Sequence, residues 1–343
     1  MRTLKYSEAI SEGLTQAMER DANVFIMGIG VDYPSGIFGT TREPARRFGP
    51  SRVFDTPACE NALTGIAIGA AACGKRPVLV HARNDFLFLA LDQLLNLAAK
   101  WKYMFGGASC VPIVVRAVIG KGWGQGATHS QSLQAVLGHF PGLCVVMPAF
   151  PRDAKGLVLS ALRHSAPVVI LEHRSLYDTS GPVSAQPEET PIGKAAVVRS
   201  GSDATVVATS WMVGESVRAA AGLATQGIQV EIVDLRSIRP LDEDTVIASV
   251  RKTGRLVVAD TSWQLCGVAS EIAALAAEKA FASLKAPVKR ITLADCPAPV
   301  SYSLEPVFYP TAATIAEAVR ASLGLESASP AAFPRDDSFQ GPY

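Results

Sequence analysis

The chain alternates short runs of valine, isoleucine and leucine with segments in which apolar residues recur at helical spacing. Residues 111–118 (VPIVVRAV) and 167–173 (PVVILEH) are runs of the first kind, and residues 151–163 form a segment of the second. Nearly continuous apolar runs of this length indicate strands that helices cover on both faces, as in a central parallel sheet. The alternation therefore predicts an α/β fold with doubly wound sheets.

This alternation is interrupted once, by polar sequence that contains several prolines. Such a composition is typical of a crossing between domains. The sequence therefore predicts a first α/β domain over residues 1–185, a linker over 186–203 and a second α/β domain over 204–325. The remaining residues, 326–343, have the composition of a disordered tail.

The charge of the chain is balanced, with 32 Lys and Arg against 31 Asp and Glu. No basic cluster marks a nucleic-acid or anionic-membrane surface. The amino-terminal residues lack the apolar core of a signal peptide, and the longest apolar stretch, Ala62–Cys73, is too short to span a bilayer. Six cysteines are scattered singly, which predicts buried, reduced thiols. We expect a cytoplasmic protein whose partners are small molecules or proteins, without nucleic acid or membrane.

Two glycine-rich stretches follow predicted strands. Gly28-Ile-Gly30 lacks the third glycine of a dinucleotide site, so a nicotinamide-binding fold is not supported and a tight turn is the simpler interpretation. Residues 120–132 (GKGWGQGATHSQS) follow a strand that ends near Val118 and contain His129. Ligand sites of parallel α/β sheets lie at this edge of the sheet, although a flexible surface loop explains the glycines equally well.

Glu60 precedes NALTGIAIGAAAC, a predicted helix with almost no polar residue. A charged, unpaired carboxylate at a buried position costs several kcal/mol. Glu60 would be stabilised at the helix amino terminus by the helix dipole, or it would be a proton-transfer group with a pKa raised by its apolar surroundings. Phe86 and Phe88 follow another strand, where an aromatic pair is more often part of the core than a cofactor contact.

Several longer segments occur in one order along the chain, from about Tyr6 to Leu323: DTPACENALTGIAIGAA, NDFLFLALDQLLNLAAK, GGASCVPIVVRA, ATHSQSLQAVLGHFPGLCVVMPAFPRDAKGLV, DLRSIRPLDEDTV and ADCPAPV. In this collinear order they resemble the beta subunits of the thiamine-diphosphate-dependent pyruvate and branched-chain 2-oxo acid dehydrogenases. The resemblance implies a pyrimidine-binding, transketolase-like domain followed by a transketolase C-terminal-like domain.

The resemblance also assigns roles to individual residues. Glu60 matches the glutamate that contacts N1′ of the cofactor's aminopyrimidine ring, and Phe86 and Ala58 match residues that bind the same ring. His129 matches an active-site histidine near the substrate. The family also has a potassium site built from backbone carbonyls. By the resemblance, this site would lie near Ile113 and residues 161–164, with the carbonyls of Ile113, Ala161 and His164 as candidate ligands.

The family binds the diphosphate and Mg²⁺ through a GDG motif, and no GDG occurs in this sequence. The resemblance therefore implies that the Mg²⁺ ligands lie on an alpha subunit, in an α2β2 heterotetramer that holds the cofactor between unlike subunits. Such an enzyme decarboxylates a 2-oxo acid oxidatively and passes the acyl unit to the lipoyl group of an acyltransferase core.

Substrate identity stays open because two segments depart from the pyruvate type. VHARNDF, around Phe86, is closer to branched-chain members, and the glycine-rich loop before His129 differs as well. Pyruvate, acetoin, a branched-chain 2-oxo acid and an unusual biosynthetic substrate all remain candidates. Two alternatives concern the reaction itself: a split transketolase that transfers a ketol unit, and a non-catalytic scaffold subunit.

Overall fold

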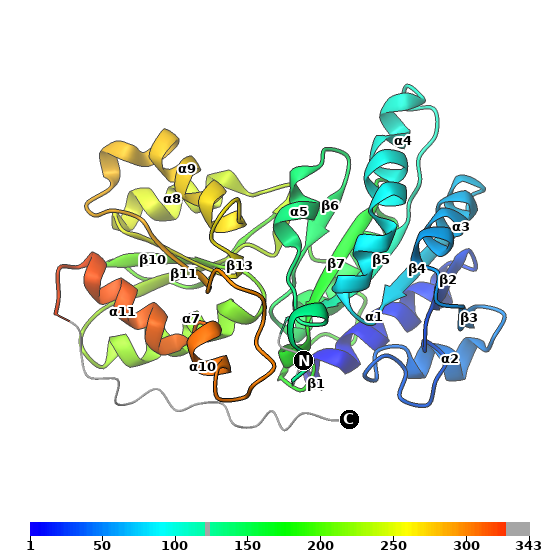
Figure 1. The fold of residues 1–343 in the computed structure, drawn as a ribbon, viewed down its shortest axis with the longest axis horizontal. Helices are drawn as coiled ribbons and strands as arrows, with labels where there is room; N and C mark the ends of the chain where they lie inside the picture. Colours follow the sequence, from blue (N-terminus) through cyan, green and yellow to red (C-terminus); the bar gives the residue numbers. More distant parts are fainter. Residues whose placement is uncertain (121–123, 327–343) are drawn as a thin grey trace. The chain divides into compact units, whose positions relative to one another are not determined.

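The structure is a computed structural model that describes residues 1–120 and 124–326. By its internal contacts the chain divides into two compact units, shown as ribbons in Figure 1. The first contains residues 1–121 and 136–192, and the second contains residues 122–135 and the chain from residue 193 onward. The segment that carries His129 therefore groups with the second unit. The predicted tail lies outside the described residues from 327 onward.

The first unit is built on parallel strands in the order β6-β7-β5-β4-β2-β3. Their bounds are β2 (Val24–Gly28), β3 (Val53–Phe54), β4 (Arg76–His81), β5 (Val114–Ile119), β6 (Cys144–Val146) and β7 (Val168–His173). Every residue of β5 and β7 is buried, which confirms that helices cover both faces of the central strands. The predicted α/β class is thus confirmed.

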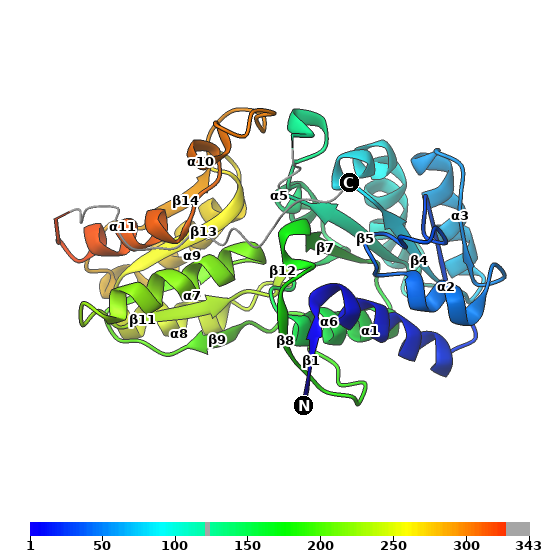
Figure 2. The ribbon, with the colours of Figure 1, turned by 90° about the horizontal axis from the view of Figure 1, so that it is seen from below.

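Helices cover this sheet on both sides. The helices of the first unit are α1 (Tyr6–Arg20), α2 (Arg42–Phe48), α3 (Glu60–Ala72), α4 (Ala99–Met104) and α6 (Pro151–Arg163), with the short 3₁₀ helix η4 (Arg174–Leu176). The 3₁₀ helix η3 (Gly126–Thr128) belongs to the second unit, and α5 (Gln134–His139) begins there and continues into the first. Helices α1 and α6 pack side by side, as Figure 2 shows, and α3 packs against β4. The strand β1 (Arg2–Lys5) pairs antiparallel with β8 (Ser180–Val183), which joins the two ends of the unit.

Apolar residues at helical spacing over residues 88–104 predict one continuous helix there, and the structure differs from this prediction. The helical region begins earlier, as the 3₁₀ helix η1 (Asn84–Ala90), and continues as the π-helix η2 (Asp92–Ala98). Asn84, Leu87 and Ala90 are all fully buried. Their spacing of three residues places them on one face of a 3₁₀ helix, which explains the local preference.

The second unit has strand order β14-β13-β10-β11-β9. Strands β10 (Ala204–Ala208), β11 (Val230–Asp234), β13 (Leu256–Trp263) and β14 (Lys289–Leu293) are parallel, and β9 (Ala196–Arg199) is antiparallel to β11. The remaining elements are α7 (Trp211–Ala224), β12 (Ser237–Arg239), α8 (Glu243–Thr253), α9 (Val268–Ala280), η5 (Phe281–Ser283), α10 (Glu305–Phe308) and α11 (Ala312–Ser322). Helix α8 packs with α9, and α7 packs with α11 (Figure 1).

The expectation of buried cysteines is wrong for four of the six. Cys59, Cys73, Cys266 and Cys296 are exposed, Cys144 is buried, and the sixth is half-buried; all six thiols are free. Cys59 and Cys73 flank α3, an apolar helix with one exposed face. An apolar run in a sequence does not distinguish residues of a core from residues of an exposed apolar surface.

Among the described residues, no helix is both long enough and apolar enough to cross a membrane.

A buried ion pair joins the two central strands of the first unit. Arg116 of β5 donates to Glu172 of β7 through Nε (2.6 Å to Oε1) and Nη2 (2.8 Å to Oε2), and the two side chains are 1% and 0% exposed. The Tyr177 hydroxyl donates to the same carboxylate at 2.7 Å. Burial raises the pKa of Tyr177 well above its usual value, so this hydroxyl keeps its proton and remains a donor.

Replacing Arg116 by methionine should lower the free energy of unfolding by about 3–5 kcal/mol, because Glu172 would stay buried without its cation. The double variant Arg116→Met/Glu172→Met removes both charges and should recover most of that loss. Urea unfolding of the purified chain measures both. A single variant no less stable than the double one would show that the pair is not what stabilises this sheet.

Candidate functional site

The carboxyl edge of the first sheet carries several of the residues singled out from the sequence. After β2 the chain turns tightly at Gly28, whose φ is 147° and where a Cβ would lie 2.3 Å from the Val80 carbonyl oxygen. The Gly30 amide then donates to Asp55 Oδ1 at 2.7 Å, which joins the end of β2 to the chain after β3. These glycines therefore form a tight turn that only glycine fits.

Glu60 is the first residue of α3 and is half-buried. Its carbonyl oxygen accepts a hydrogen bond from Thr64 Oγ1 at 2.8 Å, while its carboxylate lies at the positive end of the helix dipole. The preceding residues, Ala58 and Cys59, are exposed. A carboxylate is thus held at the start of an apolar helix, at the surface of the first unit.

Phe86 lies on η1, directly after β4, and η1 packs against α3. The Phe86 side chain is 38% exposed, so it is not a core residue. Ile66 on α3 is 60% exposed, and Phe88 and Leu89 on η1 are also exposed. We refer to Ile66, Phe86, Phe88 and Leu89 as the α3/η1 apolar surface. Apolar side chains of this size on neighbouring elements mark an interaction surface.

His129 lies on the segment that belongs to the second unit, directly after η3. It is half-buried, and its Nδ1 is 2.8 Å from Thr128 Oγ1. Its backbone N–H donates to the Gly126 carbonyl at 3.3 Å. The structure therefore brings the elements of Ala58, Glu60 and Phe86 together in the first unit and carries His129 in the second. Residues 121–123 of the glycine-rich loop lie outside the described residues.

Sequence reasoning missed His81, the last residue of β4. It is buried, and burial lowers the pKa of its imidazole from 6.5 to about 4. No hydrogen bond to Nε2 is found within the described part of the chain. The available signal was the position of this histidine at the end of the apolar run PVLVH. An imidazole in a strand that helices cover on both faces is buried and therefore neutral. His81 therefore adds no charge beneath the loop that carries Phe86.

The carbonyls of the expected potassium site already have donors. The Ile113 carbonyl accepts from a backbone N–H of β7 at 3.0 Å, and the Ala161 carbonyl accepts from the His164 N–H at 3.2 Å. Arg76 Nη1 donates to the Leu162 and His164 carbonyls at 2.8 and 3.3 Å. A potassium ion at the His164 carbonyl would face the like charge of the Arg76 guanidinium. The potassium site stays a prediction.

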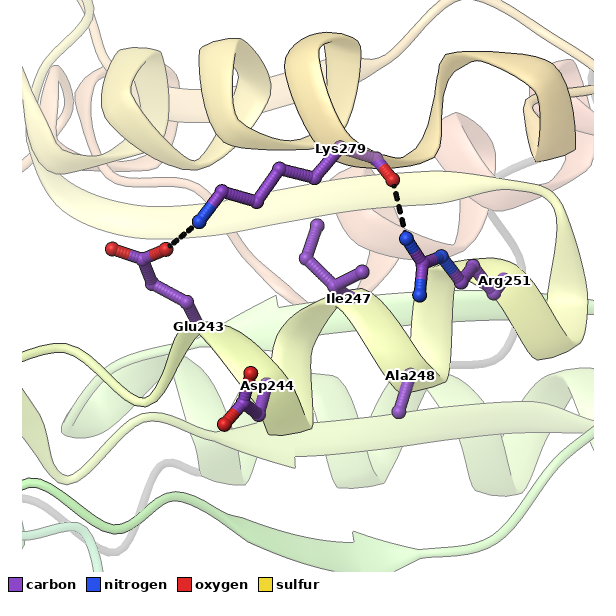
Figure 3. Close-up of a pocket in the computed structure, with 6 residues that line it drawn as sticks. All are labelled: Glu243, Asp244, Ile247, Ala248, Arg251 and Lys279. Carbon is purple, nitrogen blue, oxygen red and sulfur yellow. Dashed lines mark hydrogen bonds and ion pairs between the residues drawn. The ribbon is translucent and has the colours of Figure 1, made fainter.

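Other candidate sites in the described chain are less informative. No group of three or more His, Cys, Asp or Glu residues able to hold a metal occurs in residues 1–120 and 124–326. A mostly apolar pocket of about 520 Å³ lies where α4 ends, and none of the predicted site residues lines it. A second pocket of about 160 Å³, between α8 and α9, is shown in Figure 3. There Lys279 pairs with Glu243, and Arg251 Nη2 donates to the Lys279 carbonyl at 2.8 Å. The polar groups named here have partners within the protein, and we assign no ligand to this pocket.

Comparisons with protein families divide the chain into two successive domains. Residues 2–179 match the transketolase pyrimidine-binding domain, and residues 193–315 match the transketolase C-terminal domain. Among solved structures, a split gene transketolase described as an inactive beta4 tetramer superposes with a TM-score of 0.75. That alignment covers 94% of this chain and 99% of the other at 23% identity, a level that shows the shared fold alone.

Curated relatives are similar at higher identity. The beta subunit of acetoin:2,6-dichlorophenolindophenol oxidoreductase from Cupriavidus necator is 42% identical over 332 residues, which cover 94% of this chain and 98% of that protein. The mitochondrial pyruvate dehydrogenase E1 component subunit beta-2 of Oryza sativa is 43% identical, with 91% and 84% covered. The human mitochondrial E1 beta subunit is 41% identical, with 93% and 90% covered.

The lowered pKa of His81 predicts a pH dependence of stability. Because the unfolded chain binds this proton more tightly, the contribution of neutral His81 is present above pH 6.5 and is lost as the pH falls toward 4. For this group alone the loss between pH 7 and pH 5 is about 2 kcal/mol. His81→Leu should remove it. Urea unfolding at both pH values, with exposed His139→Leu as the control, measures the difference; equal losses in wild type and His81→Leu would contradict it.

Proposed function

Because the chain belongs to the transketolase-like family of 2-oxo acid dehydrogenase beta subunits, we propose that it supplies the pyrimidine-binding half of a shared thiamine diphosphate site. The complete site acts on a 2-oxo acid or a related carbonyl substrate, and an alpha subunit supplies the other half. The acyl unit then passes to the lipoyl group of an acyltransferase core.

The main observation behind this proposal is that Glu60 lies on α3 and Phe86 lies on η1, and that these two elements contact each other. An aminopyrimidine ring requires an apolar or aromatic surface for its face and a hydrogen-bonding acid for N1′. Phe86 offers a partly exposed ring, and Glu60 offers a carboxyl group at the surface of the same unit. Ala58, two residues before Glu60, has a small exposed side chain. These residues fit the ring.

Thiamine diphosphate supplies, when bound, the carbanion chemistry that cleaves the bond beside a carbonyl carbon. The residues of this chain orient the cofactor and hold or transfer its protons. Glu60 holds a proton at N1′, and an apolar environment strengthens that charge-assisted hydrogen bond. Phe86 packs against the ring and excludes water from it. We propose that His129 acts at the substrate, where imidazole can donate or accept a proton near neutral pH.

We propose that the diphosphate and Mg²⁺ are held by the alpha subunit. Mg²⁺ prefers carboxylate and other oxygen ligands in octahedral geometry, and the described part of this chain offers no acidic cluster for it. The α3/η1 apolar surface includes Phe86 and lies partly on α3, the helix that Glu60 begins. An obligate partner that covers this surface would desolvate Glu60 and complete the site, as in an α2β2 assembly.

The alternatives have weaker support. The split gene transketolase shares the fold at 23% identity, whereas the acetoin and pyruvate relatives reach 41–43%. Transfer of a ketol unit is therefore second to cleavage of a 2-oxo acid or acetoin. Because Glu60 and His129 are both present, a non-catalytic scaffold role is less well supported.

Activity should require both subunits. The isolated chain should give no measurable heat with thiamine diphosphate and Mg²⁺ in calorimetry, because the diphosphate and metal ligands are on the partner. Mixed with its alpha subunit, it should bind both and reduce an artificial electron acceptor with one of pyruvate, acetoin or a branched-chain 2-oxo acid. Tight cofactor binding by the isolated chain, or an inactive but cofactor-loaded complex across this panel, would contradict the proposal.

Glu60→Gln should lower turnover of the assembled enzyme by at least about 100-fold, because an amide cannot hold the proton that Glu60 shares with N1′. The substitution is nearly isosteric at a half-buried position, so the melting temperature should stay within about 2 °C of wild type. Glu278→Gln, at an exposed site on α9, is the matched control. Steady-state rates at saturating cofactor measure the effect, and near-normal turnover of Glu60→Gln would exclude the assigned role.

A further inference from the structure

The second unit holds the segment that carries His129 on both sides of the histidine. On the amino-terminal side, Gly126 has φ +63°, and a Cβ there would lie 2.5 Å from Val300 Cγ2. Two residues earlier, a Cβ on Gly124 would lie 3.6 Å from the Val300 carbonyl oxygen. The glycine-rich backbone thus packs directly against Val300, which follows β14. Glycine permits both the positive φ and this close approach.

On the carboxyl-terminal side, the contact is a buried hydrogen bond. Gln134, the first residue of α5, donates from Nε2 to Asp260 Oδ1 at 2.8 Å. Thr209 Oγ1 donates to the same oxygen at 3.0 Å. The three side chains are at most 2% exposed. His129 therefore lies between two fixed points, three residues after Gly126 and five residues before Gln134.

The position of Asp260 in the sheet explains why this contact is well defined. Asp260 follows Ala259, the last residue of β13 that pairs with β10, and Thr209 directly follows β10, the parallel neighbour of β13 in the sheet. In the order β14-β13-β10-β11, the connection after β10 leads to β11 on one side and the connection after β13 leads to β14 on the other, so the switch point of the sheet lies between β10 and β13. Burial raises the pKa of Asp260, and hydrogen bonds from Gln134 and Thr209 counteract that effect. A polar group so deeply buried strongly favours the geometry that satisfies it.

We propose that Asp260 and Gln134 are positioning residues for His129, through which the second unit sets the place of the histidine on its loop. Neither residue has to touch substrate or cofactor. The inference rests on the proposed function only in assigning His129 an active-site role. The contact itself lies within the second unit and stands on the distances alone.

An exchange of the two partners tests this inference. Gln134→Glu places two carboxyl groups against each other and breaks the contact. The double variant Gln134→Glu/Asp260→Asn restores one amide and one carboxylate with their positions exchanged. In the assembled enzyme, Gln134→Glu should lower kcat roughly 10- to 100-fold, as expected for a displaced active-site group. The affinity for thiamine diphosphate should change less than about twofold, and the double variant should recover most of kcat.

A second readout does not depend on activity. In the isolated full-length chain, the NMR signal of the His129 ring, assigned with His129→Gln, should shift in Gln134→Glu and return toward its wild-type position in the double variant. Gln226→Glu, at an exposed glutamine of the second unit, should leave both readouts unchanged. An unshifted His129 signal in Gln134→Glu would overturn the inference, as would a kcat loss that the double variant does not recover. If the NMR shift and its recovery appear but no substrate is turned over by wild type, the positioning stands and the proposed function fails.

Discussion

The buried pair of Arg116 with Glu172 fixes the central strands on which the first unit is organised. Both side chains are fully buried, so their separation in a low-dielectric interior would be strongly unfavourable. The strands they join end next to each other: β5 ends at Ile119 before the glycine-rich loop, and β7 ends at His173. At Gly120 a Cβ would lie 2.2 Å from His173 Nε2, so these two strand ends approach each other as closely as glycine permits. The carboxyl edge of this sheet is therefore rigid where the chain leaves it.

Helix α3 connects the fold with the proposed function, because its apolar composition does not match its exposed position. It is almost entirely apolar, yet one face, including Ile66, is exposed. A monomeric protein gains nothing from such a face, whereas a subunit that completes its site against a partner does. Glu60 begins the same helix. One element thus carries both the surface that a partner would cover and the carboxyl group whose environment the partner would change.

Periodicity and composition predicted the α/β class and most elements well. Helix α6 has the predicted bounds, Pro151–Arg163, because a proline begins it and its apolar residues recur at helical spacing. Prediction was poorest where tertiary contacts decide the outcome. The 3₁₀ segment of residues 84–90 and the π segment of residues 92–98 replace part of a predicted α-helix. Burial of Leu87 and Ala90 favours the spacing of three in the 3₁₀ segment. The exposed thiols beside α3 were missed because local hydrophobicity is the same in a core and an interface. The pairing of Gln134 with Asp260 spans 126 residues, and no local pattern encodes it.

The grouping of residues 122–135 with the second unit also bears on how such chains can be recombined. A fusion of the first domain of one relative to the second domain of another, joined near residue 193, would follow the domain boundary along the sequence. It would also place the His129 loop of one parent against the Asp260 and Val300 equivalents of the other. A functional chimera therefore has to inherit two separated pieces of chain from the same parent, and the unit of exchange is discontinuous in the gene.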